Sequence, residues 1–131
     1  MAKKLINKSV VLNVVGTLII ITGFLMVLSI PFSFYYNDGM QGVFIQSTLI
    51  TISIGLLIKY LTRKKKDDEV KKREGYLIVA LGWTGMIICS AIPYLLSGTF
   101  DGVTNAFFET ISGLTTTGSS ILNNIEQMPE S

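Results

Sequence analysis

Residues 9–37 read SVVLNVVGTLIIITGFLMVLSIPFSFYYN, a run of 29 residues without a charged side chain. Two further uncharged runs follow, residues 39–58 with 20 residues and residues 75–100 with 26. A helix that crosses a bilayer needs about 20 predominantly apolar residues, so each run is long enough. The sequence therefore predicts an all-α integral membrane protein. Its three transmembrane helices are expected at about residues 10–36, 41–61 and 73–96.

The composition of the 131 residues favours a membrane protein and excludes several other classes. Apolar residues make up 49% and charged residues 15%, against about 25% charged residues in a typical soluble domain. The first run is longer than the apolar core of a signal peptide, and no small-residue cleavage site follows it. With no His and a single Cys, Cys89, the chain has no His triad, His metal site or disulfide framework of its own. It also lacks a nucleophile elbow and a phosphate-binding Gly loop, so we expect that it is not an enzyme.

The charged residues are distributed unevenly between the helix ends. The basic side chains all precede the first helix or lie between the second and third: Lys3, Lys4, Lys8, Lys59, Arg63, Lys64, Lys65, Lys66, Lys71, Lys72 and Arg73. The charges after the third helix are all acidic: Asp101, Glu109, Glu126 and Glu130. Cytoplasmic loops of membrane proteins carry an excess of Lys and Arg. We therefore expect a multi-pass protein of the cell membrane, with the N-terminus and residues 59–74 in the cytoplasm and residues 37–41 outside.

Two interpretations of the basic loop, residues 59–74, are open. It is a determinant of topology, or it is a binding site for anionic lipid or nucleic acid. The acids at 67–69 each stand four residues before a base at 71–73, which is the favoured order on a helix. This pattern favours a solvated extension of the third helix that determines topology. We expect contact with membrane lipid and no binding of nucleic acid.

A short amphipathic segment follows the third helix. Pro93 is expected to kink or end that helix. Residues 103–114 are apolar but too short to span a bilayer, which is typical of a re-entrant or interfacial helix. The apolar face that we expect to be packed consists of Val103, Phe107, Ile111 and Leu114, and the polar face consists of Asn105, Glu109 and Ser112.

Residues 115–120 read TTTGSS. Three β-branched Thr residues followed by Gly continue a helix poorly, but they are able to run extended. Extended backbone at membrane depth is tolerated where protein buries it or where it lines a watery cavity. A re-entrant helix followed by such a strand is typical of a cation filter, in which carbonyl oxygens replace the hydration shell of the ion. The alternative is a polar external loop, since Thr, Gly and Ser are common in loops.

Three segments resemble a known family. Residues 107–118, FFETISGLTTTG, resemble the first pore segment of the Trk/Ktr/HKT superfamily of potassium transporters. Residues 73–83, REGYLIVALGW, and 92–98, IPYLLSG, resemble the first pore-domain helix of the TrkH-type membrane subunit. The resemblance implies four non-identical repeats around one pore, each with a helix, a re-entrant pore helix with a filter strand, and a second helix. It implies potassium uptake as the function.

The resemblance also assigns roles to residues of this chain. The backbone carbonyls that would coordinate potassium belong to Thr116, Thr117, Gly118 and Ser119. Thr115 would lie at the inner end of the filter, and Glu109 would have an orienting or electrostatic role in the pore helix. Because Ser in place of the first filter Gly is associated with sodium permeation in part of the superfamily, Gly118 favours potassium over sodium.

The same resemblance divides the chain in two. Residues 1–72 would hold two N-terminal helices and the basic loop, and residues 73–131 would begin the first pore repeat, with the filter at 115–120. We expect an N-terminal fragment of a longer transporter that forms a homodimer and binds a cytoplasmic nucleotide-binding gating subunit. Potassium would be the transported ion, with no tightly bound cofactor. The alternative is a small three-helix accessory membrane protein without transport activity.

Overall fold

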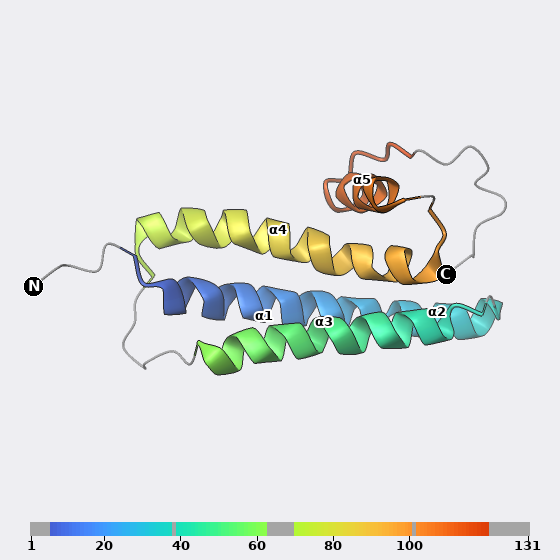
Figure 1. The fold of residues 1–131 in the computed structure, drawn as a ribbon, viewed down its shortest axis with the longest axis horizontal. Helices are drawn as coiled ribbons and strands as arrows, with labels where there is room; N and C mark the ends of the chain where they lie inside the picture. The colour runs from blue at the N-terminus through green and yellow to red at the C-terminus, as the bar shows by residue number, and fades with distance from the viewer. Residues whose placement is uncertain (1–5, 38, 63–69, 101, 121–131) are drawn as a thin grey trace, which may run out of the picture.

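The computed structural model describes residues 6–37, 39–62, 70–100 and 102–120. Its helices are α1 (Lys8–Val27), α2 (Ser29–Tyr36), α3 (Gln41–Leu61), α4 (Lys72–Ser97) and α5 (Val103–Leu114). The long helices lie side by side, with α3 antiparallel to α1 and α4, and α5 lies at the end of the bundle where α4 finishes (Figure 1). Three segments are long and apolar enough to cross a membrane: Lys8–Tyr36, Gln41–Leu61 and Lys72–Ser97. The prediction of an all-α protein with three membrane-spanning helices is confirmed, and no strand occurs in these ranges.

The first span is interrupted. The sequence predicts one helix over residues 10–36, whereas the structure separates α1 from α2 at Leu28. Pro31 explains the position, because proline has no N–H to bond the carbonyl of Val27 four residues earlier, and its ring crowds that carbonyl. The N–H of Leu28 instead bonds the carbonyl of Leu25 at 3.1 Å. Both pieces still belong to one candidate membrane span.

Helix α1 is central and contacts both α3 and α4. Glycines bring α1 and α3 close together. A Cβ added at Gly55 would lie 3.0 Å from the carbonyl oxygen of Gly16, and one added at Gly23 would lie 2.6 Å from the side chain of Ile52. In membranes, where van der Waals packing drives helix association, small residues let helix backbones approach closely. The α1–α3 pair is therefore packed backbone against backbone.

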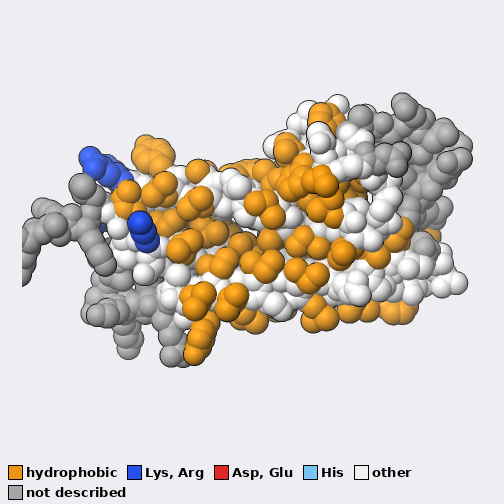
Figure 2. Space-filling model, viewed as in Figure 1, with side chains coloured by type: hydrophobic (Ala, Val, Ile, Leu, Met, Phe, Trp, Pro, Cys, Tyr) orange, Lys and Arg blue, Asp and Glu red, His pale blue; other side chains and the backbone are white. Residues whose placement is uncertain are grey.

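On its other side, α1 packs against α4 through a cluster of four buried residues, Val11, Val15, Ile19 and Cys89. Many of the other large apolar side chains are exposed. In the space-filling view they extend along most of the bundle (Figure 2). Soluble monomers rarely expose such large apolar patches, and lipid tails are the natural neighbours of this surface.

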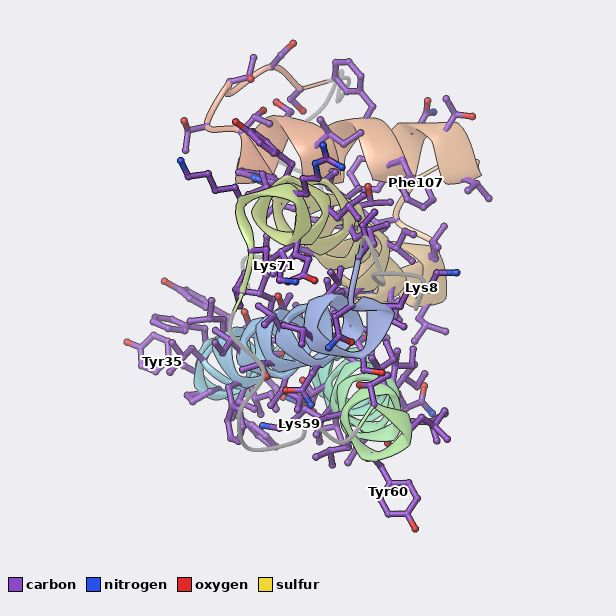
Figure 3. The ribbon with its side chains drawn as sticks, turned by 90° about the vertical axis from the view of Figure 1, so that its left-hand side faces the viewer. Lys8, Tyr35, Lys59, Tyr60, Lys71 and Phe107 are labelled. Atoms are coloured by element: carbon purple, nitrogen blue, oxygen red, sulfur yellow. The ribbon has the colours of Figure 1, made fainter. Side chains whose placement is uncertain are left out.

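Basic side chains gather at one end of the bundle, where α1 begins, α3 ends and α4 begins (Figures 1 and 2). Lys8, Lys59 and Lys71 come from this end (Figure 3). Residues 63–69, which include much of the basic loop, lie outside the described ranges. Helix α4 begins at Lys72, and Lys71 before it is extended, with ψ of 156°. Helix α4 therefore does not continue back through Val70 and Lys71, as the predicted extension of the third helix requires, and residues 67–69, which would form its charge pairs, lie outside the described residues.

At the same end, the carboxylate of Glu74 joins the starts of two helices. Glu74 is 1% exposed. One carboxylate oxygen accepts the N–H of Asn7, just before α1, at 2.6 Å, and the other accepts the N–H of Lys71, just before α4, at 2.9 Å. The first N–H groups of a helix have no partner within the helix and carry partial positive charge, so a carboxylate stabilises them. Sequence reasoning missed this role, because Asn7 and Glu74 are 67 residues apart.

Candidate functional site

Helix α5 runs across the bundle and packs on α4 (Figures 1 and 3). Its buried residues are Ala106, Thr110 and Ser112, whereas Val103 and Ile111 are 59% and 42% exposed. The prediction that the large apolar side chains form the packed face is therefore wrong for Val103 and Ile111, whereas Phe107 and Leu114 are half-buried. Ala106 and Thr110 are small and lie one turn apart, which lets α5 approach α4 closely, while Val103 and Ile111 are left for lipid or further protein.

A hydrogen-bonded turn ends α5. The N–H of Thr117 bonds the carbonyl of Ser112 at 3.0 Å, and the N–H of Thr116 bonds the carbonyl of Gly113 at 3.2 Å. The backbone of Thr116 is in the left-handed conformation, with φ of 55°. This is the Schellman arrangement, in which glycine usually takes the left-handed position. The sequence suggested an extended run from Thr115, but Thr115 and Thr116 form the turn, so an extended segment starts no earlier than Thr117.

The predicted filter residues lie on this turn and on the backbone after it. All residues of the filter segment, 115–120, are exposed. The hydroxyl of Ser112 in α5 donates to the carbonyl of Ser119 at 2.5 Å and so ties the segment back to the helix. Gly118 has φ of 70°, and a Cβ added there would meet nothing within 4 Å. Glycine is therefore favoured at this position by backbone conformation and not by lack of space.

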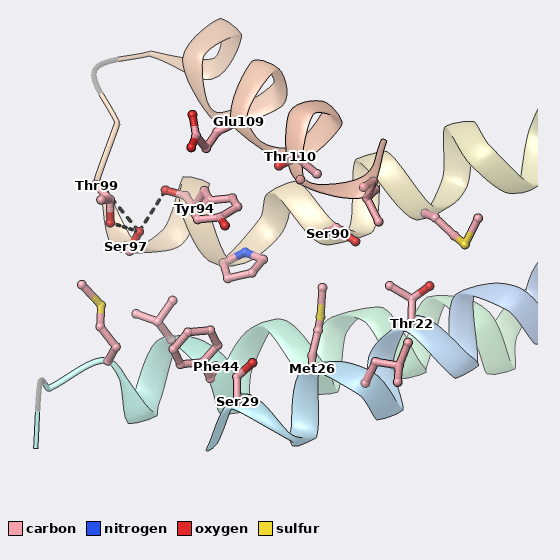
Figure 4. A pocket seen from close by; sticks show the side chains of 17 residues that line it. Thr22, Met26, Ser29, Phe44, Ser90, Tyr94, Ser97, Thr99, Glu109 and Thr110 are labelled. Atoms are coloured by element: carbon pink, nitrogen blue, oxygen red, sulfur yellow. Dashed lines mark hydrogen bonds between the residues drawn. The ribbon is translucent and has the colours of Figure 1, made fainter. Parts of the chain in front are cut away.

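Glu109 forms part of the wall of a cavity. The cavity has a volume of about 450 Å³ and is formed by residues of all five helices, and no residue of the filter segment lines it (Figure 4). Glu109 is half-buried and close enough to Tyr94 of α4 for an electrostatic interaction. Sequence reasoning missed the cavity, because its walls come from segments far apart in the chain.

The chemistry available at the filter segment is that of oxygen atoms. Within the ranges that the structure describes, no group of three His, Cys, Asp or Glu residues is placed to hold a metal ion. The exposed segment offers backbone carbonyls and the hydroxyls of Thr and Ser. The hydroxyls of Thr115 and Thr117 are already 2.8 Å apart and bonded to each other. Carbonyl oxygens are the groups that replace the hydration shell of a potassium ion in channel filters.

Comparison with known proteins identifies the family. The chain is 36% identical over 118 residues to the Trk system potassium uptake protein TrkH of Escherichia coli K12, a match that covers 89% of this chain and 24% of the relative. TrkH of Halomonas elongata is 35% identical over 121 residues, which is 92% of this chain and 25% of the relative. This chain belongs to the TrkH family. The predicted resemblance is confirmed.

Further comparisons define what this TrkH-family chain shares with its relatives. An uncharacterized cation transporter of Methanocaldococcus jannaschii is 29% identical over 121 residues, 92% of this chain and 25% of the relative. No family model matches the chain. The chain spans about a quarter of the length of the curated relatives it matches. Together with the three candidate spans, the relatives support a multi-pass membrane protein.

Proposed function

We propose that this TrkH-family chain forms part of a pore that takes up potassium across the cell membrane. The relatives at 30–36% identity are named as potassium uptake proteins, and the archaeal relative is named as a cation transporter. Three membrane spans and the exposed filter segment after a short helix fit this function. A filter surrounds its ion with carbonyls. The remaining positions of the ring would come from segments outside these 131 residues.

The observation that carries the proposal is the backbone of residues 116–118. Thr116 and Gly118 both have positive φ, in a part of the chain that is exposed. The turn that ends α5 holds Thr116 in this conformation, and Gly118 adopts it readily because it has no Cβ. A filter would use this exposed and sharply turned backbone, with the carbonyls of Thr116, Thr117, Gly118 and Ser119 facing a potassium ion.

The first test changes Gly118→Ser in a full-length protein that carries this segment. A side chain in the left-handed conformation costs about 1–2 kcal/mol, so the new Cβ is expected to shift the backbone carbonyls around residue 118. We expect the selectivity for rubidium over sodium to fall in a flux assay with vesicles, because the shifted carbonyls would fit the larger ion less well. The matched control is Gly113→Ser, which adds the same side chain in α5, where φ is helical and an added Cβ meets nothing within 4 Å. Equal selectivity in both variants would count against Gly118 as a filter residue.

The proposed orientation follows from the basic end of the bundle. Lys8, Lys59, Lys71 and Lys72 lie at that end, and we place it in the cytoplasm by the excess of Lys and Arg. The turn between α2 and α3, together with α5 and the filter segment, then lies toward the outside. A filter near the outer surface fits a protein that takes up ions.

Cysteine labelling tests this orientation. In a Cys89→Ala background, Tyr36→Cys near the α2–α3 turn is expected to react from outside with a membrane-impermeant maleimide. Lys72→Cys at the start of α4 is expected to react only after the cells are opened. Both native side chains are exposed, so access does not depend on unfolding. Labelling of Lys72→Cys in intact cells would reverse the proposed orientation.

We also propose partners for the longer protein. The resemblance implies a homodimer and a cytoplasmic nucleotide-binding subunit that gates the pore. The basic end of the bundle, placed in the cytoplasm, is on the side from which such a subunit would approach. Purification of the full-length protein with and without that subunit, followed by mass measurement of the complex, would test both partners.

A further inference from the structure

Ser112 of α5 holds the filter segment at two points. Its backbone carbonyl accepts the N–H of Thr117 at 3.0 Å, and its hydroxyl donates to the carbonyl of Ser119 at 2.5 Å. Ser112 is 7% exposed, whereas Thr117 and Ser119 are exposed. One buried residue of the helix therefore closes residues 117–119 into a loop against the end of α5.

The two hydrogen bonds differ in what they require of the sequence. The bond to Thr117 uses only the backbone of residue 112 and belongs to the turn that ends α5. The bond to Ser119 requires a hydroxyl donor on the side chain. Within a helix, a Ser or Thr hydroxyl is able to donate to the carbonyl four residues earlier, and Thr110 does so, to Ala106 at 2.7 Å. Ser112 instead donates out of the helix, to the filter segment.

Gly118 is the residue of this loop that bends the chain. Its φ of 70° is in the left-handed region, which glycine enters without steric cost and which suits tight turns. The chain after α5 turns back over the helix (Figure 1), and the carbonyl of Ser119 comes within reach of Ser112. The conformation of Gly118 and the hydrogen bond from Ser112 therefore belong to one geometry.

We propose that Ser112 is a positioning residue of the filter and that it acts through the carbonyl of Ser119. A carbonyl oxygen has two lone pairs, so the hydroxyl of Ser112 occupies one of them and leaves the other for an ion. The hydrogen bond fixes the direction of the carbonyl, as the outer hydrogen-bond partners of a metal site orient its ligands. The buried Ser112 does not itself touch the ion. The inference rests on the proposed pore function, but the hydrogen bond is testable without transport.

NMR of a single carbonyl tests the hydrogen bond in the 131-residue chain. Residues 119–120 are the only Ser-Ser pair in the sequence. Serine labelled with carbon-13 at its carbonyl and with nitrogen-15 therefore gives one directly bonded labelled pair, the Ser119 carbonyl and the Ser120 nitrogen. The chain is made by cell-free synthesis, so that the label stays on serine, and is placed in nanodiscs. Because a carbonyl resonance moves upfield when a hydrogen bond is lost, Ser112→Ala is expected to shift this signal upfield. An unchanged signal would overturn the proposal.

Thr110→Val is the matched control. It removes another buried hydroxyl of α5, but one that bonds within the helix. The Ser119 signal is therefore expected to stay where it is in the unmodified chain. A shift as large as that of Ser112→Ala would mean that the signal reports a general loosening of α5, and this result would contradict the specific role of Ser112.

Transport by a full-length protein that carries this segment tests the consequence. Ser112→Ala is expected to lower the selectivity for rubidium over sodium, and Thr110→Val is expected to leave it unchanged. A ratio of two fluxes does not depend on the amount of folded protein, so a loss of folding alone would not move it. If Gly118→Ser lowers the selectivity and Ser112→Ala does not, Ser112 is not a positioning residue. If neither variant lowers it while the NMR shift is present, the pore function itself is rejected, and the role of Ser112 with it.

Discussion

Replacement of Gly55 by alanine is expected to weaken the packing of α1 against α3. The new Cβ would lie 2.6 Å from Cγ1 of Ile20, 3.0 Å from the backbone N of Ile20 and 3.0 Å from the carbonyl oxygen of Gly16. The Ile20 side chain is able to rotate, but the two backbone atoms move only if the helices separate. Overpacking of this kind costs about 1–3 kcal/mol, and Gly55→Leu is expected to cost more. A denaturing-detergent titration, followed by a fluorescence pair on α1 and α3, would measure the loss.

Gly42 provides the matched control on the same helix. A Cβ added at Gly42 meets nothing within 4 Å, and its φ is not in the left-handed region. Because alanine is favoured over glycine in helices by about 1 kcal/mol, Gly42→Ala is expected to be neutral or slightly stabilising. If Gly42→Ala and Gly55→Ala shifted the titration equally, the close approach at Gly55 would not be what holds α1 to α3.

The fold class could be predicted from the sequence because it depends on local properties. Long uncharged runs decide whether a segment crosses a membrane, and this needs no knowledge of what lies beside it. The interruption at Leu28 could also have been predicted from the sequence, because Pro31 has no N–H to bond the carbonyl of Val27. We did not predict it, since length and hydropathy treat a kinked span and a straight one alike.

Errors arose where the result depends on the neighbours of a segment. The packed face of α5 was predicted from hydrophobicity, which in water identifies the buried side. Within a membrane, lipid accepts Val103 and Ile111, so the small residues Ala106 and Thr110 take the packed face. The same limit applies to the cavity beside Glu109, since its walls come from segments separated by many residues.

The candidate filter is an intermediate case. Gly118 was singled out because of its residue type and the motif around it, and its φ of 70° is a conformation that favours glycine. The left-handed Thr116 could not be predicted, because β-branched residues avoid that conformation. Its place is determined by the two hydrogen bonds that close the end of α5, from Thr116 to Gly113 and from Thr117 to Ser112. Gly118→Ser would act two residues further on, on the φ of Gly118 itself.

Glu74 is the residue whose replacement is expected to have the largest effect at the basic end of the bundle. Glu74→Ala removes the acceptor of two backbone N–H groups, those of Asn7 and Lys71, which start α1 and α4. Both amides are then left without their protein partner. We expect each to exchange with deuterium about tenfold faster or more, since a hydrogen bond to a charged group contributes more to stability than a neutral one. Residue-resolved hydrogen exchange in nanodiscs would measure the two amides separately.

Glu74→Gln makes the prediction sharper, because it removes one acceptor and keeps the other. The carboxamide oxygen is able to accept one backbone N–H, but its NH₂ group faces the second N–H, donor against donor. One of the two amides should therefore stay protected and the other should exchange faster, whereas Glu74→Ala should expose both. Arg73→Gln, an exposed neighbour in the same turn, is the control and should leave both amides protected. If Glu74→Gln and Arg73→Gln gave the same exchange rates, the N-terminal ends of α1 and α4 would be held together by packing alone, and the charge of Glu74 would not contribute.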